Sequence, residues 1–138
     1  MATLEMQNMN VLFVCTENAG RSQLAEHLFN AVADDHHRAR SAGTRPRDQV
    51  YPDVVRSLFR RGVDATAARP KPLTSDLLEW ADRMVTMGCG DECPVTGKPT
   101  EDWELADVRG ASPEGVESIA QEIEKRLDRL LGQLDASP

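Results

Sequence analysis

The chain has 138 residues, of which 28% are charged and 40% hydrophobic, a balance typical of globular proteins and unlike that of disordered or membrane proteins. The formal charge of -7 argues against nucleic acid or an anionic membrane surface as a partner. No apolar run approaches the roughly 18 residues that a membrane span needs. We therefore expect a single domain over residues 1–138.

The N-terminal stretch and the cysteines bear on location. The first ten residues, MATLEMQNMN, lack the basic and apolar regions of a secretory signal, so we expect a cytoplasmic protein. Three cysteines, an odd number, cannot all pair in a structural framework. Free or redox-cycling thiols are therefore expected.

The first half of the chain reads as strand, loop, helix, strand and helix. An apolar run over residues 11–14 predicts a buried strand that ends at Cys15. Helical spacing of apolar residues begins at Ser22, which we expect to cap that helix. The later elements predicted in this half are a short strand over residues 38–44 and a helix near residues 54–61, stopped by Gly62.

The second half continues the alternation. It predicts a short helix at residues 77–81 capped by Thr74 or Ser75, a buried strand at 83–87, a Gly- and Pro-rich loop at 88–101, and a long amphipathic helix from Pro113. Alternating strands and helices predict an α/β fold with a parallel sheet covered on both faces. In such sheets ligands bind beyond the carboxyl ends of the strands. Cys15 and the loop containing Cys89 each lie at the carboxyl end of a predicted strand.

The segment from Cys15 to Ser22 has the chemistry of an anion site. A loop that leads into a helix N-terminus presents backbone N–H groups and partial positive charge to one point. Arg21 can clamp two oxygens of a tetrahedral anion, and the same positive field favours the thiolate of Cys15. Ser22 can donate its hydroxyl to that thiolate. A structural cysteine beside a surface arginine is the alternative, and the C-x5-R-S spacing after an apolar strand disfavours it.

The sequence CTENAGRS resembles the phosphate-binding loop of low-molecular-weight protein tyrosine phosphatases and of the arsenate reductases built on the same fold. The resemblance continues through RSAGT at 40–44, VTMGCGDECP at 85–94 and EDWELAD at 101–107. It implies a three-layer α/β/α fold with a central four-stranded parallel sheet and Cys15 as nucleophile. The oxyanion cradle that it implies consists of Thr16, Glu17, Asn18, Ala19, Gly20 and Arg21.

The resemblance also implies a late aspartate as general acid, for which Asp107 is the candidate and Asp102 the rival. A proline usually follows that aspartate in the family, whereas this chain has Val108. From the residues alone, an aspartate in this place is more often a solvated surface carboxylate.

Two features separate a phosphatase from a reductase. Phosphatases of this family usually wall the pocket with tyrosines after the aspartate, whereas this chain has a single tyrosine, Tyr51. Trp103 could replace them, but a tryptophan there more often packs in the core or in a lid.

Cys89 and Cys93 favour the reductase, because reduction must move two electrons and hydrolysis needs no further thiol. Two packed small hydrophobic residues are the alternative for this pair.

The expected reaction converts arsenate to arsenite at Cys15, followed by a thiol–disulfide relay through Cys89 and Cys93 that thioredoxin regenerates. No tightly bound cofactor is expected. One alternative is a low-molecular-weight thiol such as mycothiol with a glutaredoxin-like recycling protein, for which Cys89 and Cys93 would be dispensable. A phosphatase acting on phosphotyrosine or small phosphate esters is a second alternative, and a non-catalytic oxyanion-binding or redox-sensing module is a third.

No metal site is expected. By resemblance, Asn18, Glu26 and Ser41 form a structural network that sometimes binds a cation, although the sequence alone predicts a solvated carboxylate at Glu26. His36 and His37 stand beside two aspartates, but adjacent residues at a helix end point in different directions. We expect both histidines at the surface.

Overall fold

The computed structural model describes residues 8–136 and confirms the alternation predicted from the sequence. Its elements are β1 (Met9–Cys15), α1 (Arg21–Val32), β2 (His37–Gly43), α2 (Pro52–Arg60), α3 (Ser75–Trp80), β3 (Arg83–Met87), the 3-10 turn η1 (Gly90–Glu92), β4 (Thr100–Asp102) and α4 (Pro113–Ala136). The segment 88–101, predicted as a loop, contains η1 and the start of β4.

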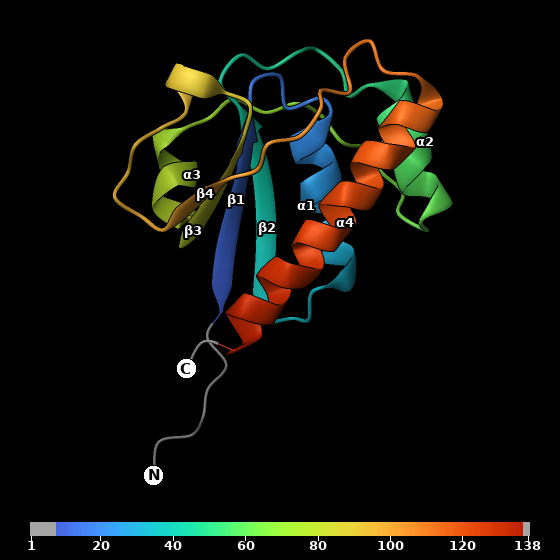
Figure 1. Ribbon diagram of the computed structural model, residues 1–138. Coiled ribbons are helices and arrows are strands. Elements are labelled where there is room, and N and C mark those ends of the chain that lie inside the picture. The colour runs from blue at the N-terminus through green and yellow to red at the C-terminus, as the bar shows by residue number, and fades with distance from the viewer. Residues whose placement is uncertain (1–7, 137–138) are drawn as a thin grey trace.

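The four strands form one parallel sheet in the order β2-β1-β3-β4 (Figure 1). The central strand β1 is apolar, and its residues Val11 to Val14 are fully buried. At its end, Cys15 pairs in register with Gly43 on β2 and with Met87 on β3. The carboxyl ends of three strands therefore meet at one edge of the sheet.

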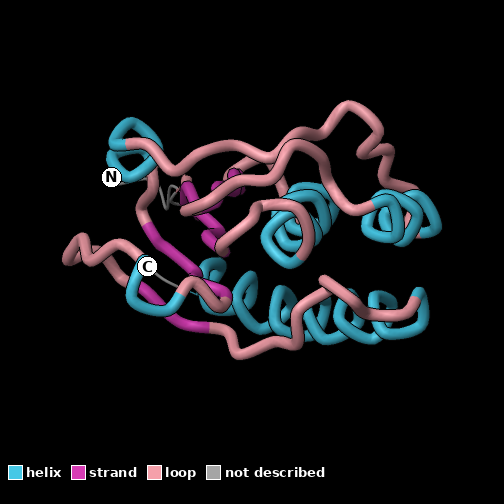
Figure 2. The backbone as a smooth tube through the Cα atoms, turned by 90° about the horizontal axis from the view of Figure 1, so that it is seen from above, coloured by secondary structure: helices cyan, strands magenta, loops and turns pink. Residues whose placement is uncertain are grey.

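Side chains of β1 alternate between two cores, as a strand with both faces covered requires. Val11 and Phe13 pack into the larger cluster with α1, α2 and α4, whereas Leu12 and Val14 pack into a smaller cluster with α3. Figures 1 and 2 show the result, with α3 on one face of the sheet and the other helices on the opposite face. The predicted three-layer α/β/α architecture is confirmed.

The helix boundaries follow from their end residues. The hydroxyl of Thr74 accepts the Leu77 N–H at 3.2 Å and caps α3, so Thr74 rather than Ser75 is the cap. After α2, Gly62 adopts φ +80°, the left-handed conformation that ends a helix. Within residues 8–136, none of the helices combines the length and apolar character that a bilayer crossing requires.

The expectation for His37 is wrong. His37 opens β2 with 5% exposure, and its Nε2 lies 2.8 Å from Asp135 Oδ1 near the end of α4. The strand begins at His37, one residue earlier than predicted, and the alternation of β2 turns His37 inward and Arg38 outward. His36 is exposed, as expected.

Candidate active site

The loop between β1 and α1 is held by its carbonyl groups. Four anchors come from the segment that follows β2, whose backbone N–H groups donate to loop carbonyls. These bonds are Thr44 to Cys15 at 3.1 Å, Arg45 to Thr16 at 2.8 Å, Arg47 to Glu17 at 3.0 Å and Tyr51 to Ala19 at 3.1 Å. Because the carbonyls point outward to this segment, the loop N–H groups are left to face an anion on the inner side.

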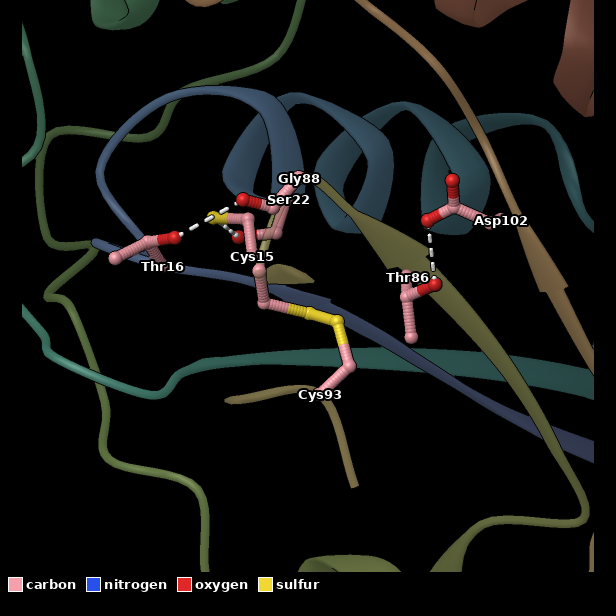
Figure 3. Close-up of a disulfide and its surroundings, with 8 residues drawn as sticks. Cys15, Thr16, Ser22, Thr86, Gly88, Cys93 and Asp102 are labelled. Atoms are coloured by element: carbon pink, nitrogen blue, oxygen red, sulfur yellow. Dashed lines mark hydrogen bonds between the residues drawn. A yellow bond between two sulfur atoms is a disulfide. The ribbon is translucent and has the colours of Figure 1, made fainter. Parts of the chain in front are cut away.

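Cys15 is a free thiol with 3% exposure. Its Sγ accepts the Asn18 N–H at 3.2 Å. Figure 3 shows its second contact, with Ser22 Oγ at 2.8 Å. The expectation that Ser22 caps α1 is therefore wrong. The helix begins at Arg21, its N-cap is Gly20, and the Ser22 side chain turns toward the thiol.

Asn18 organises the back of the loop. It is fully buried, and its φ of 51° is the left-handed conformation that asparagine tolerates better than most residues. Its Nδ2 donates to Ser22 Oγ at 2.8 Å and to Ser41 Oγ at 2.9 Å, and Ser41 in turn donates to Glu26 at 2.7 Å. The network predicted from the resemblance is thus confirmed, and the solvated Glu26 predicted from the sequence alone is wrong.

Arg21 joins three parts of the site. Its guanidinium donates to the Leu105 carbonyl at 3.2 Å and lies 3.5 Å from an Asp107 oxygen. It also packs over Gly88, where a Cβ would come within 2.5 Å of Nη1. The Asp107 side chain is half exposed. The predicted loop arginine and the preferred acid candidate are therefore neighbours.

Val108, which departs from the family pattern, is a packing residue. It is 4% exposed, and a Cβ at Gly20 would overlap its Cγ2 atom. The loop that carries Asp107 thus rests directly on the anion loop. The rival acid, Asp102, accepts a 2.7 Å hydrogen bond from Thr86 and lies apart from the Cys15 group in Figure 3.

Aromatic residues do not form the wall expected of a tyrosine phosphatase. Trp103 is 4% exposed and packs against Phe13 in the core, with the ring centroids 5.6 Å apart and the rings tilted by 53°, so its interpretation as packing is confirmed. Tyr51 donates to Glu17 Oε1 at 2.7 Å, while the Arg47 guanidinium lies over its ring. Burial, followed by the hydrogen bond to Glu17, raises the pKa of the Tyr51 phenol.

Cys89 and Cys93 form a disulfide across η1, with their Cα atoms 5.2 Å apart. Cys89 is 6% exposed and packs into the α3-side cluster, whereas Cys93 is half-buried. Gly88, which precedes Cys89, accepts a hydrogen bond from the Thr16 hydroxyl through its carbonyl at 3.2 Å (Figure 3). This bond connects the disulfide segment to the residue after Cys15. The three cysteines therefore gather at one edge of the sheet.

Sequence reasoning missed two residues behind the loop. Gln23 is fully buried and its amide contacts Asn18, and Lys71 pairs with Glu26 at 3.3 Å. A polar residue on the apolar side of a helix was the available signal for Gln23. Among residues 8–136, no group of three or more His, Cys, Asp or Glu side chains is arranged to hold a metal ion.

Proteins of known structure have a similar overall fold. A thioredoxin-dependent arsenate reductase from Corynebacterium glutamicum superposes with a TM-score of 0.81 at 39% identity, over 96% of this chain and 64% of that one. An arginine phosphatase from Geobacillus stearothermophilus superposes with a TM-score of 0.78 at 25% identity, over 91% of this chain and 92% of the other.

A glutaredoxin arsenate reductase from Synechocystis is 27% identical over 90% of this chain and 97% of its own length. Residues 10–137, nearly the whole described chain, match the low molecular weight phosphotyrosine protein phosphatase family. The match includes the anion loop, the parallel sheet and the segment that carries Asp107. The chain therefore belongs to the low molecular weight phosphotyrosine protein phosphatase family.

Proposed function

We propose that this chain, taken as one domain over residues 1–138, is an arsenate reductase that receives its electrons from thioredoxin. Cys15 is the nucleophile, Arg21 and the backbone N–H groups of the loop hold the oxyanion, and Asp107 is the general acid. The N–H groups come from Thr16, Glu17, Ala19 and Gly20, whereas the Asn18 N–H donates to Cys15 Sγ.

In the first step the Cys15 thiolate attacks arsenic(V) and expels hydroxide, which Asp107 protonates to water. The Asn18 N–H and the Ser22 hydroxyl, at 3.2 Å and 2.8 Å from Cys15 Sγ, stabilise the thiolate before attack. Fixed donors around an anion need no reorganisation during the reaction. The product is a bond between Cys15 Sγ and arsenic(V).

The next steps transfer two electrons. The Cys89 thiolate attacks Cys15 Sγ, the sulfur–arsenic bond breaks with its electron pair on arsenic, and arsenite leaves. The Cys93 thiolate then attacks Cys89 Sγ, which frees the Cys15 thiolate and leaves the Cys89–Cys93 disulfide. The dithiol of thioredoxin reduces this disulfide and becomes oxidised itself.

One observation carries the proposal, namely a Cys89–Cys93 disulfide next to an anion loop whose own cysteine is free. This combination is the state that a completed relay would leave. The Corynebacterium relative, a thioredoxin-dependent arsenate reductase, supports thioredoxin as the donor. The proposal includes a cytoplasmic location, because thioredoxin keeps thiols such as Cys15 reduced there.

Two alternatives rest on specific similarities. The arginine phosphatase relative and the Arg21–Asp107 pair support hydrolysis of phosphate esters at the same loop. The glutaredoxin arsenate reductase relative supports a different donor, in which a small thiol such as mycothiol attacks the arsenic adduct. Neither alternative requires a disulfide between Cys89 and Cys93.

The test measures NADPH oxidation on addition of arsenate to the protein with thioredoxin and thioredoxin reductase. Hydrolysis of nitrophenyl phosphate is followed in the same sample. Arsenate-dependent NADPH oxidation with feeble hydrolysis supports the reductase and its donor. Brisk hydrolysis without NADPH oxidation identifies a phosphatase, and arsenate reduction only with mycothiol and a glutaredoxin identifies the other donor.

A further inference from the structure

Gln23 is a fully buried amide under the anion loop, on the first turn of α1. Its Nε2 lies 3.1 Å from three oxygens, which are the Asn18 carbonyl, Asn18 Oδ1 and the Arg69 carbonyl. Because both carbonyls only accept, this atom of the amide must be the nitrogen. The other end, Oε1, lies 3.1 Å from His27 Nε2 and accepts a hydrogen bond from the ring N–H.

This orientation fixes the direction of the neighbouring hydrogen bonds. Asn18 Oδ1 accepts from Gln23 and from the Lys71 backbone N–H at 2.8 Å, so Asn18 Nδ2 is the donor to Ser22 and Ser41. Ser22 Oγ already accepts this bond. Its own hydroxyl proton is then available to Cys15 Sγ, 2.8 Å away.

We propose that Gln23 is a positioning residue for the nucleophile. It clamps Asn18 by both backbone and side chain in the left-handed conformation, so that the Asn18 N–H and the Ser22 O–H converge on Cys15 Sγ. Donors directed at a thiolate favour it over the neutral thiol. The inference rests on the proposed function in one respect, that Cys15 is the reacting group.

The test is the pH dependence of Cys15 alkylation by iodoacetamide, in a background with Cys89→Ser and Cys93→Ser so that one of the three cysteines remains. Gln23→Met keeps the side-chain length and removes the donor. We expect the midpoint of the alkylation profile to rise by about one pH unit. Gln121→Met, the same change on an exposed position of α4, should leave the midpoint unchanged.

Other charges near Cys15 are the same in these variants. They are Arg21 with Asp107 in front of the loop and Glu26, Lys71 and His27 behind it. A shifted midpoint therefore reports the lost donor. A purely structural role would lower the activity without moving the midpoint, and an unchanged midpoint in folded Gln23→Met overturns the inference.

Gln23→Leu provides a second variant that removes the donor without adding a charge, and it decides the question if Gln23→Met fails to fold. The midpoint should again rise, and an unshifted midpoint in this variant contradicts the inference. Alkylation needs neither arsenate nor thioredoxin, so the result is readable even if the arsenate assay of the wild-type protein is negative.

Discussion

The two loops that meet at the carboxyl edge of the sheet are built in opposite ways. In the anion loop, residues 15–22, Asn18 and Ser22 are fully buried and four carbonyls are anchored to the segment after β2. In the redox segment, residues 88–99, only Cys89 is buried, and Val95 is completely exposed. Anion chemistry needs donors that stay in place, whereas the proposed relay needs Cys89 to exchange one sulfur partner for another.

The redox segment is nevertheless tied at both ends. The Gly88 carbonyl accepts from Thr16 at 3.2 Å, and the Lys98 ammonium donates to the last carbonyls of α3. Between these anchors, the Arg45–Glu92 ion pair is solvent-exposed on both sides and contributes little to stability. A segment fixed at its ends and weakly held between them can move without detaching from the site.

Substitutions of the cysteines should have the largest effect on activity, and they distinguish the role of the anion loop from that of the redox segment. Cys15→Ser should abolish both arsenate reduction and nitrophenyl phosphate hydrolysis, because both need the thiolate. Cys89→Ser and Cys93→Ser should block thioredoxin-linked turnover and spare hydrolysis. The coupled NADPH assay and the hydrolysis assay measure the two activities, and full thioredoxin-linked turnover in Cys93→Ser would exclude the relay.

Gly88→Ala tests the contact between the loops. A side chain at φ +80° is strained, and here it also meets the Arg21 guanidinium. We expect kcat for nitrophenyl phosphate to fall by about a hundredfold, the effect of displacing a binding group by about 1 Å. Gly97→Ala is the matched control, since Gly97 has φ +77° with open space around it. Equal activity losses in the two variants would show that strain alone is responsible.

The difference between the loops also explains what the sequence could predict. The anion loop is local in sequence, so the strand, Cys15, Arg21 and the helix after them were all predictable from residues 9–32. The strand register and the packing between distant segments were not predictable from local sequence. The burial of His37 depends on where β2 begins, and the contact of Val108 with Gly20 joins segments that no local pattern connects.

Short-range patterns also misassigned two polar side chains. Ser22 has the residue type and position of an N-cap, but tertiary contacts with Asn18 and Cys15 direct its hydroxyl elsewhere. Glu26 lies at a helix position that usually faces solvent, yet Ser41 and Lys71 from distant segments cover it. In both cases a hydrogen-bond partner far along the chain determines the role.

Lys98→Met tests the anchor of the redox segment. The ammonium donates to the Leu78, Glu79 and Ala81 carbonyls, which a helix end leaves without partners. We expect a loss of about 2 kcal/mol in the free energy of unfolding, typical of hydrogen bonds to a charged group. Urea unfolding measures it, with the exposed Lys125→Met as control. A loss no larger than that of the control would mean that the anchor is energetically neutral.

The smallest effect concerns His27, whose ring donates to the Gln23 amide behind the anion loop. Burial lowers the pKa of His27, the Glu26 carboxylate opposes the shift and the Lys71 ammonium adds to it. The unfolded chain therefore takes up a proton before the folded one. The free energy of unfolding therefore falls as the pH drops below about 6.5, the pKa of an unfolded histidine. Above that pH, His27 is neutral in both states and has no such effect.

Urea unfolding at pH 7.5 and pH 5.5 should accordingly show a smaller loss of stability in His27→Gln than in the wild-type protein. The difference cannot exceed about 1.4 kcal/mol, because only the one pH unit between pH 6.5 and pH 5.5 lies below the pKa of an unfolded histidine. His36→Gln, at an exposed position, should behave as the wild-type protein does. His27→Gln could instead lose as much stability as the wild-type protein. Protonation of His27 would then not affect the stability of the network behind the anion loop. The physical reason would be that the ring can donate its Nε2–H to Gln23 in both charge states.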